Sequence, residues 1–189
     1  MLKYIWAIFF TIILTACGDV SEDSSNKASM PKSVENKLND NYASMSSDIE
    51  WYQDKFEQPI KRVGAKDVDL LIKTVGVKPV KIENSSDEKG EPKQIYLFSK
   101  NVIRSQLEYS PNMLIIAWYQ ASDDEDTLKH SQESLKTAYL FARAVAGDEG
   151  AKAVRTISMG GKLEGNLVSD YSASGQCAME LCLLRFELK

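Results

Sequence analysis

The chain has 189 residues, 43% of them hydrophobic, which is enough for one domain with a proper core and short for two. It carries 23 Lys and Arg residues against 27 Asp and Glu residues, a net charge of -4, so no basic stripe is available for nucleic acid. One histidine and three cysteines leave no cluster of metal ligands. We therefore expect no metal, no cofactor and no nucleic-acid partner.

The first predicted element is a run of eleven mostly apolar residues, 4–14, which follows Lys3. As a helix it would be about 16 Å long, shorter than a hydrocarbon core of about 30 Å. Such a segment is typical of a secretory signal peptide and not of a permanent membrane span. Leu14-Thr15-Ala16-Cys17 comes at its end and closely resembles the lipobox of bacterial lipoproteins. The resemblance covers only about the first twenty residues.

By this resemblance, residues 1–16 are a lipoprotein signal peptide, and Cys17 becomes the acylated first residue. Each buried methylene contributes about 0.8 kcal/mol, so two or three acyl chains, such as palmitate, would hold the protein in the bilayer almost permanently. The implied location is the cell envelope, lipid-anchored and facing the periplasm. Gly18 and not Asp follows the cysteine, which favours the outer over the inner membrane. The alternative is an ordinary secretory signal that happens to contain a cysteine.

The segment after the cysteine differs in composition from the rest of the chain. Residues 17–33 are mostly Ser, Asp, Asn and Lys, with almost nothing to bury. We expect a lipidated, disordered tether there. Residues 34–189 are then predicted to form a single domain.

Two amphipathic helices are predicted at the start of this domain. Apolar residues recur at helical spacing over 34–56, and Pro59 lies just after the predicted end of this helix. A shorter helix is predicted over 68–75, with Asp67 as its cap and Gly76 just past its end.

Alternating or continuous apolar runs then predict strands, separated by Gly, Pro and Asn turns. The predicted strands are 80–83, 94–99, 102–109, 113–119, 167–172 and 181–188, with a polar loop over 84–93. The run 113–119 is apolar on both faces, which is typical of a central strand, and the three strands over 94–119 are expected to form an antiparallel meander. A long helix capped by Asp126 or Thr127 is predicted to stop at Gly147, with a second helix from Asp148 to about Ile157. The fold class is therefore α+β, an antiparallel sheet of about five strands with amphipathic helices packed on it.

Two cysteines remain besides Cys17, namely Cys177 and Cys182. An even pair in an exported domain predicts a disulfide, because oxidising compartments preserve the bond. A redox dithiol or a metal pair is the alternative. The spacing is not Cys-x-x-Cys, however, and no other cysteine or histidine lies nearby in sequence.

The sequence nominates no catalytic residue. His130 follows Asp126 by one helical turn, so a carboxylate could orient the imidazole as a general base. That arrangement needs a nucleophile, and none is apparent. Gly160-Gly161-Lys162 lacks the other residues of a phosphate-binding loop, and the serine–lysine spacing over 86–89 lacks the companion motifs of an acyl-enzyme.

Adjacent aromatic residues give a possible interface: Trp51 with Tyr52, and Trp118 with Tyr119. Neighbours on a helix or strand point in different directions, so one of each pair can be exposed as an interface anchor. Core packing is the other interpretation of these four residues.

Taken together, these features predict a membrane-anchored, non-catalytic envelope lipoprotein whose domain binds another envelope protein. One alternative is a periplasmic inhibitor or immunity-type lipoprotein, whose sequence support is the acidic cluster 123–126. The other is a cell-wall-acting enzyme. The bilayer, through acylated Cys17, and a protein of the envelope are the expected partners.

Overall fold

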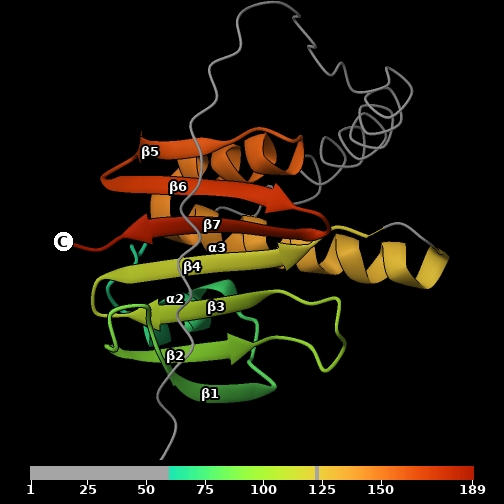
Figure 1. Ribbon diagram of the computed structural model, residues 1–189, viewed down its shortest axis with the longest axis horizontal. Coiled ribbons are helices and arrows are strands. Elements are labelled where there is room, and N and C mark those ends of the chain that lie inside the picture. The colour runs from blue at the N-terminus through green and yellow to red at the C-terminus, as the bar shows by residue number, and fades with distance from the viewer. Residues whose placement is uncertain (1–59, 122–123) are drawn as a thin grey trace, which may run out of the picture.

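The computed structural model describes residues 60–121 and 124–189. The expected signal peptide, the tether, Cys17 and the helix predicted over 34–56, with its Trp51 and Tyr52, lie outside the described residues. Figure 1 shows one antiparallel sheet with helices behind it. The α+β class is confirmed, with seven strands in place of about five.

Helix α2, Val68–Val75, has the bounds that the sequence predicts. The Asp67 carboxylate accepts a hydrogen bond from the backbone N–H of Leu70 at 2.9 Å and so caps the helix. Gly76 adopts a left-handed conformation, φ 76°, and ends the helix. Val68 and Leu71 are buried on its inner face.

The first four strands form an antiparallel meander, as predicted for three of them. They are β1 Lys81–Ser86, β2 Pro92–Leu97, β3 Gln106–Ser110 and β4 Met113–Tyr119. The polar loop predicted over 84–93 is wrong, because β1 and β2 pair as far as Ser86 and Pro92 and leave only a short turn. As an edge strand, β1 buries few side chains, so its polar sequence lacks the alternation that marks half-buried strands.

Helix α3 spans Glu125–Ser158 and begins slightly earlier than predicted. Its cap is Asp124, whose carboxylate accepts from the N–H of Thr127 at 2.8 Å. The predicted stop at Gly147 is a break within α3: Ala146 and Gly147 leave the helical conformation, and Gly147 has φ 66°. A residue with a side chain adopts that conformation only with strain, so glycine fits the break.

The last three strands are β5 Leu163–Val168, β6 Tyr171–Ala178 and β7 Leu181–Glu187. The single strand predicted over 167–172 is wrong, because the chain turns there between β5 and β6. Gly165 sits at an irregularity in the β5 register, with φ 67°. The prediction for β7 is confirmed within a residue.

The sheet order is β1-β2-β3-β4-β7-β6-β5, so β4 and β7 lie in its centre. Both described helices lie on the same face of this sheet (Figure 1). The core forms between that face and the helices. Large, fully buried side chains come from both sides of it: Leu107, Leu114, Ile116, Trp118, Leu184 and Phe186 from the sheet, and Leu71, Phe141, Val145, Val154 and Ile157 from the helices. Within the described residues, no helix is both long and apolar enough to cross a membrane.

Candidate functional site

The other face of the sheet carries no described helix, and we call it the helix-free face (Figure 1). Side chains alternate between the two faces of a strand, so the neighbours of core residues point to it. Strands β2, β4 and β7 present on it a set of apolar side chains that all lie outside the core cluster. They are Ile95, Leu97, Met113, Ile115, Ala117, Tyr119, Leu181 and Leu183. Leu97, Met113 and Ala117 are buried, Leu181 is exposed, and the others are half-buried.

Polar side chains of β3, Gln106 and Glu108, lie between the apolar residues of β2 and the apolar centre on β4 and β7. Lys93 Nζ lies 2.7 Å from Glu108 Oε2, and both side chains are only 17% exposed. Gln106 Nε2 donates to the other oxygen of Glu108 at 2.9 Å. Towards the edge, Lys81 pairs with Glu83 at 2.6 Å and lowers the pKa of that carboxyl. A hydrogen-bonded polar border beside an apolar centre is the usual arrangement of a protein-binding surface.

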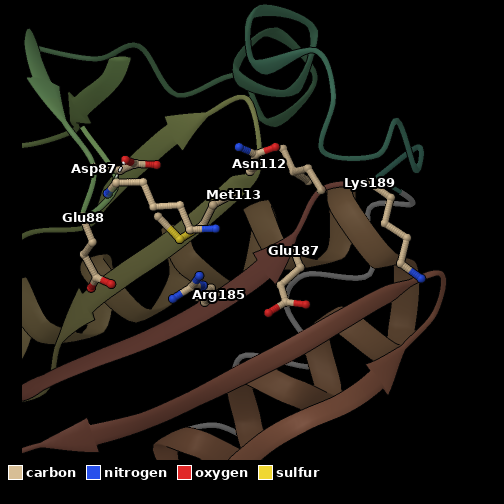
Figure 2. Close-up of a pocket in the computed structure, with 9 residues that line it drawn as sticks. Asp87, Glu88, Asn112, Met113, Arg185, Glu187 and Lys189 are labelled. Carbon is tan, nitrogen blue, oxygen red and sulfur yellow. Dashed lines mark hydrogen bonds between the residues drawn. The ribbon is translucent and has the colours of Figure 1, made fainter. Parts of the chain in front are cut away.

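A cavity of about 330 Å³ opens at one end of the helix-free face (Figure 2). Three segments far apart in sequence build it: the β1–β2 turn, the β3–β4 turn and the end of β7. Its lining combines both signs of charge with two apolar side chains. The lining residues are Asp87, Glu88, Lys89, Asn112, Met113, Arg185, Glu187, Leu188 and Lys189.

Arg185 is one of the residues that line this cavity. Its direct partners across the sheet are Ile115 on β4 and Ser174 on β6, and neither is charged. The side chain is half-buried, and its Nε is buried without a hydrogen-bond partner. In the view of Figure 2 the guanidinium lies below Met113, between Glu88 and Glu187. The sequence shows that Arg185 faces away from the core, but not that three segments enclose it.

The two aromatic residues of β4 have opposite environments. Trp118 is 0% exposed, because it faces the helices, so its predicted interface role is wrong. Tyr119 is half-buried and points to the helix-free face, and its backbone N–H donates to Ser134 Oγ at 3.1 Å. Within the described residues, the predicted aromatic interface is reduced to Tyr119.

The predicted Cys177–Cys182 disulfide is confirmed. The two residues are direct cross-strand partners next to the turn that joins β6 to β7. Cys182 is fully buried, and its Sγ lies 3.1 Å from Gln120 Oε1. The bond therefore fastens the hairpin that delivers β7 to the centre of the sheet.

His130 lies in a different cavity, of about 280 Å³, between the start of α3 and the segment that connects β2 to β3. Its Nε2 is 3.1 Å from Asn101 Nδ2, and its Nδ1 is 3.7 Å from Glu133 Oε2. No ion pair joins His130 to Asp126 in the part of the chain that the structure describes. Ser134 lines the same cavity, and its hydroxyl accepts the backbone N–H of Tyr119 on β4; within the described residues no hydrogen bond joins it to His130.

Two further features bear on the alternatives. Asp124 of the acidic cluster caps α3, and Asp123 lies outside the described residues, so this cluster gives an inhibitor role little support. Among residues 60–121 and 124–189, no three His, Cys, Asp or Glu side chains are placed to hold a metal ion.

Comparison of the chain with protein-family models, with curated proteins and with solved structures finds no match.

Proposed function

We propose that this chain is a lipid-anchored, non-catalytic envelope lipoprotein whose domain binds another envelope protein through the helix-free face. The supporting observation is the apolar centre of that face, which lies beside polar side chains of β3 and outside the core. Apolar and aromatic side chains near the middle of such a surface supply most of the binding energy of protein complexes. Acylation of Cys17, which the lipobox resemblance implies, would keep the domain near envelope partners.

A site-specific crosslinking experiment in intact cells tests this function. Tyr119 and Leu181 are direct cross-strand partners on the helix-free face. A photoreactive phenylalanine analogue at either position is expected to give one discrete crosslinked protein. The control position is Leu70 on α2, which is 42% exposed, close to the 37% of Leu181. Absence of crosslinks from the helix-free face, or an identical pattern from Leu70, would contradict the proposal.

A matched pair of charge substitutions gives a second readout. Leu181→Asp places a charge on the proposed interface, and Leu70→Asp places one at similar exposure on α2. Because burying an unpaired carboxylate is costly, Leu181→Asp is expected to remove the crosslink made from Tyr119. Leu70→Asp is expected to leave it in place.

A further inference from the structure

We propose that the cavity around Arg185 receives a carboxylate side chain of the protein partner, an Asp or Glu that has an apolar residue beside it. This inference rests on the proposed function, because it names the chemistry of the partner at one end of the same face. It follows from three properties of the cavity.

The first property is a guanidinium that has lost part of its hydration without gaining a partner. Arg185 Nε is buried and has no acceptor, and no ion pair to Arg185 forms within the described residues. Its neighbours across the sheet, Ile115 and Ser174, are uncharged. Burial of Nε restricts the side chain, so an incoming carboxylate can bind the outer nitrogens with less ordering of the side chain.

The second property is that two other carboxylates near Arg185 are already used, while Glu88 and Glu187 of the lining make no ion pair with it within the described residues. Glu108, which lies two strands away in the same row, accepts from Lys93 and Gln106. Asp87 Oδ1 accepts from the backbone N–H groups of Lys89 and Glu91, both at 2.9 Å, and so holds the β1–β2 turn. Neither can turn to Arg185 without breaking these hydrogen bonds.

The third property is the charge and polarity of the rest of the lining. Glu88 and Glu187 lie on either side of the guanidinium in the view of Figure 2, and Lys89 and Lys189 also line the cavity, so the lining has no excess of positive charge that would favour a doubly charged phosphate over a singly charged carboxylate. Met113 and Leu188 supply apolar walls, and Met113 continues into the apolar centre of the helix-free face. A partner segment that has an acidic side chain next to an apolar one therefore matches both the guanidinium and the apolar walls. The net charge of the chain, -4, does not favour an anionic lipid surface as the occupant.

The test uses the full acylated chain in neutral detergent micelles, with three probes titrated separately. These are N-acetyl-Glu-Leu-amide, N-acetyl-Gln-Leu-amide and inorganic phosphate, and the readout is the NMR shift of Arg185 Nε–H. The Glu peptide is expected to bind about tenfold more tightly than the Gln peptide, because a charge-assisted hydrogen bond is lost. Equal binding of the two peptides, or tighter binding of phosphate, would overturn the inference.

Two variants locate the binding. Arg185→Gln is expected to abolish the preference for Glu over Gln, measured by calorimetry. Glu187→Gln removes a like charge from the lining and is expected to tighten Glu-peptide binding about twofold. The control is Lys81→Gln, which removes a cation outside the cavity that is paired with Glu83 and should change nothing. Weaker binding in Glu187→Gln would contradict the inference, even if Arg185→Gln fails to fold.

The crosslink from Tyr119 separates this inference from the proposed function. If the crosslink persists at full strength in Arg185→Gln protein of normal abundance, the face binds its partner without the carboxylate contact, and only the inference is overturned. If wild-type protein gives no crosslink from the helix-free face, the proposed function fails. The contrast between the two peptides on wild-type protein still decides the chemistry of the cavity.

Discussion

The hydroxyl of Ser131 makes two hydrogen bonds to one residue, Ala121. It accepts from the backbone N–H of Ala121 at 2.8 Å and donates to the carbonyl oxygen of the same residue at 2.7 Å. Both residues are buried. Ala121 follows β4, and Ser131 lies in the second turn of α3. These two hydrogen bonds therefore fix the position of the start of α3 relative to the end of β4.

Ser131→Ala is therefore expected to lower the free energy of unfolding by about 1–3 kcal/mol, since it leaves a buried N–H and a buried carbonyl without partners. Urea denaturation of the full chain measures this. The control is Thr137→Ala, in which the lost hydroxyl donates only to the carbonyl of Glu133 in its own helix. It should change stability by no more than about 0.5 kcal/mol. Equal effects of the two substitutions would contradict the assigned role of Ser131.

The cap of α3 should make stability depend on pH in the acid range. Hydrogen bonding from Thr127 holds the pKa of the Asp124 carboxyl below its usual value of 3.8. A lowered folded-state pKa contributes stability that is present above the unfolded-state pKa and lost as the pH falls through the folded one. Asp124→Asn keeps a capping oxygen but does not titrate. Between about pH 5 and pH 2, the urea midpoint of the wild type should fall relative to that of Asp124→Asn. The same change of both midpoints with pH would contradict the prediction.

Removal of the disulfide should destabilise the domain. The closed loop is short, so the double variant Cys177→Ala and Cys182→Ala is expected to lose about 2 kcal/mol. Reductant should lower the stability of wild-type protein by a similar amount and leave the double variant unchanged. Mass spectrometry should find two alkylated thiols only after reduction. Free thiols in protein taken from its native compartment would contradict the prediction.

Lipidation is predicted at Cys17, from the sequence Leu14-Thr15-Ala16-Cys17. Cys17→Ser should block processing, remove labelling by an acyl-chain analogue and release the domain from membranes, because the predicted attachment site of the lipid is this thiol. Normal cleavage and membrane retention in this variant would show that the segment is not a lipobox.

His130 should be dispensable. Its side chain is 37% exposed, and its polar contacts among the described residues are with Asn101 and Glu133. His130→Ala is expected to change stability by no more than about 0.5 kcal/mol and to complement fully any phenotype of the gene deletion. Loss of function at normal protein abundance would instead point to chemistry in the cavity beside it.

Elements with strong local signals could be predicted from the sequence. Helix α2 has a capping Asp67 and a terminal Gly76, β4 is apolar on both faces, and β7 alternates from Cys182 to Phe186. Each of these residues either ends a helix or is buried in a strand, so its side-chain type indicates its place in the fold. The break in α3 could be predicted for the same reason, since Gly147 interrupts an otherwise regular pattern.

The strands whose bounds the sequence did not predict lie at the edges of the sheet, where backbone hydrogen bonds stabilise them more than buried side chains do. Strand β5 exposes most of its side chains, including Leu167 at 79%, so burial leaves no alternating pattern in its sequence. The ends of β1 and β2 are missed for the same reason. The cavity around Arg185 was beyond prediction because residues 87–89, 112–113 and 185–189 meet only when the whole sheet has formed.

The position of β7 has a consequence for how the chain folds. The meander β1–β4 and the hairpins β5–β7 each join neighbours in sequence, but the β4–β7 pairing joins Met113 to Glu187 and spans all of α3. Such a distant contact forms slowly, because the intervening chain must be ordered first. Until then β4 presents an unpaired, apolar edge to other chains, which is a hazard for aggregation. A newly made chain would therefore depend on a chaperone, or on rapid arrival of its last strand, to protect that edge.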